Sequence, residues 1–202
     1  MIINFSNDCD PYGYRYISCF FNLRSHYIFV SKKACYSSLC ALSSSKCKRV
    51  WEIHDVNNST FSGIVRNPYG RLESLYKDKV LLNVDPNGGL QLTQKEIVNI
   101  FGKDRFFGKN ISFEDFIFAM PKLIATECHF FPQSKFIPSF VTAIHHMESY
   151  NEINEAFSLF DSESIICNKT EPIQLFWSSK MYEIINSIYN DDFIRFGYEL
   201  CW

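Results

Sequence analysis

The chain has no large excess of charge, no long apolar run and none of the common nucleotide-binding loops. Its 202 residues carry a formal net charge of −2, so no global attraction draws it to nucleic acid or to an anionic membrane. No run of about 18 apolar residues occurs, so we expect no segment to span a bilayer. The motifs GxxxxGK[S/T] and GxGxxG and a kinase catalytic loop are absent, which argues against these nucleotide-binding classes.

The cysteines also lack the spacing of a metal knuckle. There are 8 of them, but none forms a CxxC pair. Neither "CYSSLC" with Cys47 nor the isolated pair Cys128–His129 has ligand spacing, so we expect no metal site. The start "MIINFSNDCD" has no basic region followed by an apolar stretch, which predicts no secretory signal. We therefore expect reduced, mostly buried thiols and a protein that is cytoplasmic or delivered into a target cell.

What the sequence does have is apolar and aromatic material. Hydrophobic residues make up 47% of the chain and aromatic residues 17%, with 20 phenylalanines. Burial of so much apolar surface can offset the entropy lost on ordering, so the chain is expected to fold. A large aromatic core or interface should result.

The hydrophobic spacing changes along the chain. Alternation predicts strands over 13–21, 25–31 and 48–56, and a further strand that runs into a turn over 79–89. Turn residues occupy 57–63, and a short helix is predicted over 31–44. Helical spacing predicts helices within 112–127, 136–160 and 171–200, the first opened by Ser112 and Asp115 in a variant capping box. The expected fold is α+β. A small twisted antiparallel or mixed sheet forms in residues 1–110, and a helical portion, 111–202, packs on it in one compact unit.

Three pieces of the strand-rich half stand in a suggestive order. Tyr14 and Arg15 lie on an early strand, Ser31 ends a strand that runs into a helix, and Gln94-Lys95-Glu96 follows a later strand. This order, over residues 12–108, resembles mono-ADP-ribosyltransferase toxins and effectors of the Arg-Ser-Glu class. The serine motif departs from that class, because it reads "VSKK" where the family has "STS".

The resemblance implies that NAD is the substrate and that a protein is the acceptor. Arg15, beside Tyr14, would hold the pyrophosphate as a charged fork, and Ser31 would orient the ribose and the carboxylate. Glu96, at a strand edge, would stabilise the oxocarbenium-like state, and Gln94 would face the acceptor. The family implies a bacterial effector or toxin with no metal requirement.

Each of these residues also has an ordinary structural interpretation. Ser31 is compatible with a helix N-cap, and Arg15 with a solvated strand arginine. Thr93 as N-cap with Glu96 in the capping-box position predicts a helix over 94–101, which explains this stretch without any chemistry.

Two other functional classes stay open. In a papain-like cysteine protease or deamidase, Cys35 at a helix start would be the nucleophile, His145 or His146 the base and Asp161 its partner. The histidines, however, lie in a segment predicted to be helical, where that fold needs a strand. The other class is a non-enzymatic immunity or adaptor protein that binds a partner through its aromatic C-terminal helical half.

Overall fold

The computed structural model describes residues 3–4, 17–22, 26–31, 48–50, 52–53, 57–82, 89–149, 152–153 and 173–202. Before residue 57, the side chains described are those of residues 26–30, Val50 and Ile53. The chain divides into two compact units. The sheet unit comprises residues 1–67 and 133–169, and the helical unit comprises 68–132 and 170–202. This division differs from the boundary predicted near residue 110, because helices begin at Pro68.

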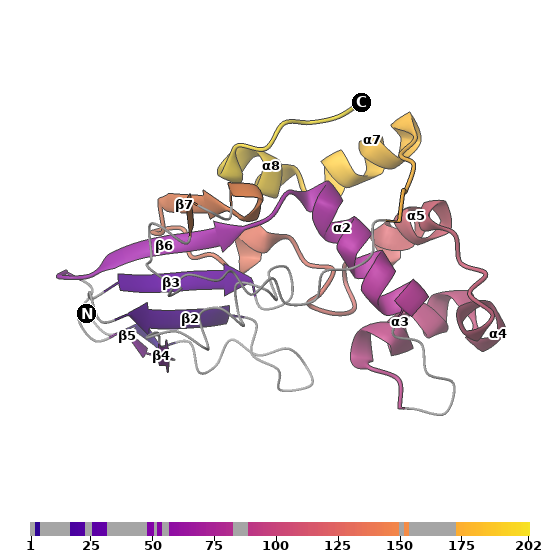
Figure 1. Ribbon diagram of the computed structural model, residues 1–202, viewed down its shortest axis with the longest axis horizontal. Helices are drawn as coiled ribbons and strands as arrows, with labels where there is room; N and C mark the ends of the chain where they lie inside the picture. Colours follow the sequence, from indigo (N-terminus) through magenta and orange to yellow (C-terminus); the bar gives the residue numbers. More distant parts are fainter. Residues whose placement is uncertain are drawn as a thin grey trace. The chain divides into compact units, whose positions relative to one another are not determined.

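The elements of the described residues are mostly short, and Figure 1 shows them in sequence colours. In chain order they are β1 (Ile3–Asn4), β2 (Ile17–Asn22), β3 (His26–Ser31), β4 (Lys48–Val50), β5 (Glu52–Ile53), β6 (Thr60–Val65), α2 (Pro68–Tyr76), the π-helical η1 (Lys77–Leu82), α3 (Leu92–Phe101), α4 (Lys103–Phe107), α5 (Phe113–Leu123), the 3-10 turns η2 (Gln133–Lys135) and η3 (Met147–Ser149) on either side of β7 (Ala143–His146), α7 (Ser179–Ile188) and α8 (Asn190–Phe196). None of the helices seen in these ranges combines the length and apolarity needed to cross a membrane.

The sheet unit contains a mixed sheet with the strand order β4-β2-β3-β6-β7. The pairs β4–β2 and β2–β3 are antiparallel, whereas β3–β6 and β6–β7 are parallel (Figure 1). A separate antiparallel pair joins β1 to β5. Together with the helices of the other unit, this sheet confirms the predicted α+β class.

One face of the sheet is covered by aromatic side chains. The rings of Tyr27 and Phe61 stack with centroids 5.6 Å apart, and Phe140 meets Phe61 edge-on at 5.2 Å. Gly63 of β6 lies beneath the segment that follows η2. A Cβ there would come within 3.0 Å of the Ile137 side chain, so glycine permits this close approach.

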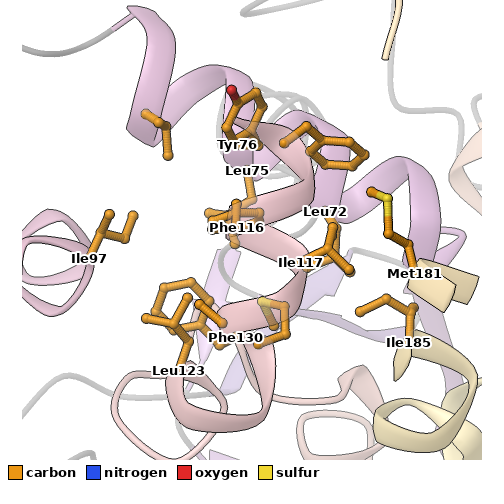
Figure 2. Packing of buried hydrophobic residues seen from close by; sticks show 14 of the residues in the cluster. Leu72, Leu75, Tyr76, Ile97, Phe116, Ile117, Leu123, Phe130, Met181 and Ile185 are labelled. Atoms are coloured by element: carbon orange, nitrogen blue, oxygen red, sulfur yellow. The ribbon is translucent and has the colours of Figure 1, made fainter. Parts of the chain in front are cut away.

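The core of the helical unit is built around α5. Its apolar residues recur at helical spacing, and Phe116, Ile117 and Met120 are fully buried. In Figure 2, Ile97 approaches α5 from α3 on one side, and Ile185 approaches from α7 on the other. The wider cluster also includes Leu72, Leu75, Tyr76, Leu123, Phe130 and Met181.

The predicted cap of α5 is confirmed. The Asp115 N–H donates to Ser112 Oγ at 3.0 Å, and the Ser112 N–H donates to Asp115 Oδ2 at 3.2 Å. Arg105 adds an ion pair with the same carboxylate oxygen at 2.7 Å. Such capping depends on residues three apart in the chain, so it can be predicted from the sequence.

Several predicted elements in the first half are wrong. The strand predicted from residue 79 is helical as far as Leu82, because η1 continues directly from α2. The turn predicted over 57–63 is present only before residue 60, because Thr60–Val65 forms strand β6. The strand predicted over 48–56 is, by contrast, confirmed at β4 and β5, and residues 51 and 54–56 lie outside the described residues. The helix predicted over 31–44 lies, from residue 32, outside the described residues.

In the second half, the helix predicted over 136–160 is wrong at 143–146, whereas Glu152 and Ile153 are helical. Residues 143–146 form β7, which pairs in parallel with β6. Pairing with a strand some 80 positions earlier in the chain is a tertiary effect that local spacing does not reveal. The helical prediction for 171–200 is confirmed from Ser179 through Phe196, in α7 and α8.

Candidate functional site

The residues predicted for NAD belong to different parts of the molecule. Ser31 is the last residue of β3 in the sheet unit, where its backbone pairs with Ile17. Gln94 and Glu96 belong to α3 of the helical unit. Tyr14 and Arg15 lie outside the described residues.

Within α3, the strand edge expected for Glu96 is wrong. The helix runs through Glu96, as the alternative capping interpretation predicted. The cap itself differs, because Gln91 and not Thr93 is the N-cap residue. The Gln91 N–H donates to Gln94 Oε1 at 3.0 Å, and Gln94 is buried. Gln94 therefore serves the start of the helix and does not face solvent, where an acceptor would be.

The residues of the cysteine-protease hypothesis are described in part. His145 and His146 lie on strand β7 and not in a helix, which removes the objection that the sequence raised. Burial lowers the pKa of His145, neighbouring His146 lowers it further, and Glu152 opposes both. Cys35 and Asp161 lie outside the described residues.

A different group of reactive side chains comes together in the helical unit, on the loop that follows α5. This loop, residues 124–132, carries Glu127, Cys128 and His129 in succession. It folds into overlapping turns, in which Phe130 N donates to Glu127 O at 3.0 Å and Phe131 N to Cys128 O at 3.3 Å. One donor atom from each of the three consecutive side chains lies within 4.8 Å of the other two.

The Glu127 carboxylate is the centre of this Glu-Cys-His cluster. Its side chain is 0% exposed, and its oxygens are surrounded by donors. The Cys128 thiol donates to Oε1 at 3.0 Å, and the His129 backbone N–H donates to Oε2 at 3.0 Å. Nδ1 of His129 lies 2.5 Å from the same Oε2. A buried carboxylate is tolerated only with such partners.

Thr93 of α3 closes the cluster from a second element. Its hydroxyl lies 3.0 Å from Glu127 Oε2, to which it donates, and 2.6 Å from His129 Nδ1. Thr93 is fully buried, so its hydroxyl is committed to these two neighbours. The residue that the sequence offered as a helix cap therefore links α3 to the loop.

Arg71 of α2 reaches the same loop from a third element. Its Nη2 donates to the backbone carbonyl of His129 at 2.7 Å, although the residue is only 3% exposed. Within the described ranges its Nε and Nη1 atoms have no hydrogen-bond partner. The guanidinium also lies over the Tyr189 ring, 5.7 Å from its centroid.

Tyr189 holds the next carbonyl of the loop. Its hydroxyl donates to Phe130 O at 2.6 Å, and its ring is completely buried. Burial raises the pKa of Tyr189 far above its usual value, Arg71 opposes this, and Asp192 adds to it. The hydroxyl therefore stays protonated and donating, and the loop is fixed by α2, α3 and the α7–α8 junction.

Comparison with known proteins adds no assignment to this geometry. No protein-family model, no curated protein and no solved structure matches the chain. The function must be inferred from the residues themselves.

The cluster has the donor set of a metal centre. A thiol, an imidazole and a carboxylate on one loop are the ligand types that proteins use for zinc. The sequence prediction had dismissed Cys128 and His129 for lack of a spaced partner. The prediction overlooked the preceding Glu127, because three consecutive donors match no common zinc motif. The contacts from Thr93 and Arg71 come from distant parts of the chain, so they could not be predicted either.

Proposed function

We propose that the helical unit binds a divalent cation of the zinc type through Glu127, Cys128 and His129. The observation that supports this most directly is the convergence of carboxylate, thiol and imidazole donor atoms within 4.8 Å of one another. Zinc accepts all three donor types, and magnesium and calcium, which prefer oxygen, do not suit a thiolate.

The present distances are compatible with a contracted metal site. Tetrahedral zinc, with bonds near 2.0–2.3 Å, would separate its ligand atoms by about 3.3–3.6 Å. The corresponding pairs are 2.5 Å for His129 Nδ1 to Glu127 Oε2 and 3.0 Å for Cys128 Sγ to Glu127 Oε1. These two pairs would have to open by about an ångström or less, which side-chain rotation can supply, and the third pair, Cys128 Sγ to a ring nitrogen of His129, lies within 4.8 Å.

Protons now occupy the space between these donor atoms. The Cys128 thiol and the Thr93 hydroxyl donate to Glu127, and His129 Nδ1 lies within hydrogen-bonding distance of Thr93 and of the carboxylate. A cation would replace these protons, because zinc binds the thiolate, a neutral imidazole and the carboxylate. Three protein ligands leave a tetrahedral ion one further position, the arrangement typical of reactive zinc centres.

The experiment is a calorimetric titration of the metal-free protein with zinc. The wild type should bind one ion at this site, and Cys128→Ser should weaken that binding by more than the roughly 10–100-fold expected for a supporting residue. Cys201→Ser is the matched control, because Cys201 belongs to the same unit and is exposed.

Both variants keep the remaining cysteines, Cys9, Cys19, Cys35, Cys40, Cys47 and Cys167. A zinc ion held by these thiols would bind equally to both variants. Equal zinc binding by Cys128→Ser and Cys201→Ser would therefore refute the site.

The transferase hypothesis remains a separate proposal for the same chain. It requires Arg15, Ser31 and Glu96 to act on NAD, with a protein as acceptor and delivery into a target cell. NAD should then raise the melting temperature of the wild type, and Glu96→Gln should remove transferase activity. Absence of any NAD effect on the wild type would end this proposal without bearing on zinc. A partner bound through the aromatic C-terminal helices is likewise a proposal, testable by pull-down.

A further inference from the structure

We infer that the metal centre has an anion subsite, in which Arg71 holds an anionic oxygen ligand, a carboxylate or a phosphate, at the fourth zinc position. This inference rests on the proposed zinc site. It adds the chemical class of the molecule on which the centre would act.

The unsatisfied guanidinium is the first observation behind it. Arginine carries five N–H donors, all permanently charged. For Arg71 the hydrogen bond described goes from Nη2 to His129 O, while Nε and Nη1 lack an acceptor in the described part of the chain. Burial of donors without acceptors is costly, and a guanidinium matches carboxylate and phosphate geometry.

The position of Arg71 is the second observation. His129 supplies both the imidazole of the Glu-Cys-His cluster and the carbonyl that receives the guanidinium. Arg71 is 3% exposed, and no salt bridge to it is found among the described residues. Its charge therefore lies beside the proposed metal site and not in bulk solvent.

Charge balance decides which kind of ligand fits. Zinc with a carboxylate, a thiolate and a neutral imidazole is electrically neutral, since the two negative ligands match its charge. Arg71 adds one positive charge beside this centre, and no ion pair among the described residues compensates it. The loaded centre keeps one buried positive charge, which is unfavourable unless a counter-charge pairs with it.

Asp192 is the other buried carboxylate of this region. It acts on Tyr189, whose pKa it raises, and on Arg195, whose pKa burial lowers and Asp192 raises. No ion pair joins Asp192 to Arg71 among the described residues. An external anion would supply acceptors to Nε and Nη1 of Arg71, which have none in the described part of the chain.

The test uses the cobalt-substituted wild-type protein, because cobalt occupies zinc sites and its visible spectrum reports the ligands. Addition of inorganic phosphate or of acetate should change the visible bands while the cobalt–thiolate charge-transfer band persists. A response to phosphate alone would identify a phosphate ligand, and a response to acetate alone a carboxylate. No response to either anion would overturn the subsite.

Arg71→Lys keeps the charge but removes the planar fork, so the apparent affinity for the responding anion should fall at least tenfold. Arg105→Lys is the matched control in the same unit, and it should respond as the wild type does. If Arg71→Lys binds the anion as tightly as Arg105→Lys does, the inference is wrong. If Arg71→Lys does not fold, the response of the wild-type cobalt spectrum to the two anions still tests whether the subsite exists.

Failure of the subsite and failure of the zinc proposal give different results. A protein that binds cobalt through Cys128 without an anion response keeps the metal site and loses the subsite. A protein that binds no cobalt at this thiol loses both.

Discussion

Nδ1 of His129 lies 2.5 Å from Oε2 of Glu127, and Thr93 Oγ1 lies within hydrogen-bonding distance of both atoms. These three groups come from α3 and from the loop after α5, and Thr93 lies 34 residues before Glu127 in the chain. The contact gives a buried carboxylate its partners and orients the imidazole. It is the structural basis of the proposed metal centre.

Removal of the Thr93 hydroxyl should affect both stability and metal affinity. Thr93→Val leaves Glu127 Oε2 without one of its donors, so the metal-free protein should lose about 1–3 kcal/mol in a urea unfolding experiment. Zinc affinity should fall about 10–100-fold, as for other groups that orient metal ligands.

Thr93→Ser is the control, because it keeps the hydroxyl at the same position. Serine should restore most of the zinc affinity. A valine variant that binds zinc as tightly as the serine variant would show that the hydroxyl does not orient the ligands.

Zinc affinity should fall as the pH is lowered. The Cys128 thiol donates its proton to Glu127 in the metal-free protein, and zinc must displace that proton. Each proton released makes the apparent affinity change about tenfold per pH unit over the range in which the proton is bound. Calorimetry in two buffers of different ionisation heat would count the protons, and a count of zero would contradict thiolate ligation.

The sheet unit should become less stable as the pH falls below about 6.5, the usual histidine value. Burial lowers the pKa of His26, with His145 adding to the effect, and burial also lowers the pKa of His145. Both groups bind protons more readily when unfolded, so their contribution to stability is complete above pH 6.5. It is lost as the pH falls through the folded values.

His26→Gln tests this prediction, since glutamine can still bond to Ser62, which lies 2.8 Å from His26 Nε2. The stability difference between pH 7.5 and pH 5.5 should be smaller in His26→Gln than in the wild type. Ser62→Ala removes the hydrogen bond but leaves the histidine, so it should keep the wild-type slope. An unchanged slope in His26→Gln would rule out this histidine as the cause.

Replacement of a phenylalanine of α5 by alanine should destabilise the protein strongly at position 116 and only weakly at position 118. Phe116 is 0% exposed, and Phe118 on the same helix is 44% exposed. Phe116→Ala should cost about 3–5 kcal/mol of unfolding free energy, and Phe118→Ala, at a partly exposed position, much less. Equal losses in urea unfolding would mean that the described packing of α5 is incorrect.

Local patterns in the sequence predicted the elements that depend on near neighbours. The Ser112–Asp115 cap of α5 and the helices α7 and α8 follow from spacing within a few residues, and they are present. Local capping residues also predicted a helix at Glu96, as the alternative to the strand edge that the family resemblance required. The structure has this helix.

Elements that depend on distant pairing were not predictable. Strand β6 contains Ser62 and Gly63, which indicate a turn locally, yet parallel pairing with β3 and β7 makes it a central strand. The helical spacing at 136–160 was overridden at β7 by pairing to that strand. Tertiary contacts therefore decided both cases.

The candidate site was missed for the same reason. Thr93 was interpreted as a cap because only its chain neighbours were considered, whereas its hydroxyl donates to Glu127 on the loop after α5. Arg71 lies nearly 60 residues before the carbonyl that it binds, so no sequence window includes both.

X-ray absorption at the zinc edge of the protein loaded with one equivalent of zinc tests the central claim most directly. Binding by Glu127, Cys128 and His129 predicts one sulfur at about 2.3 Å, with nitrogen and oxygen ligands at about 2.0–2.2 Å. The same measurement on Cys128→Ser should lose the sulfur. A spectrum without sulfur in the wild type, or with the same sulfur in Cys128→Ser, would contradict the account.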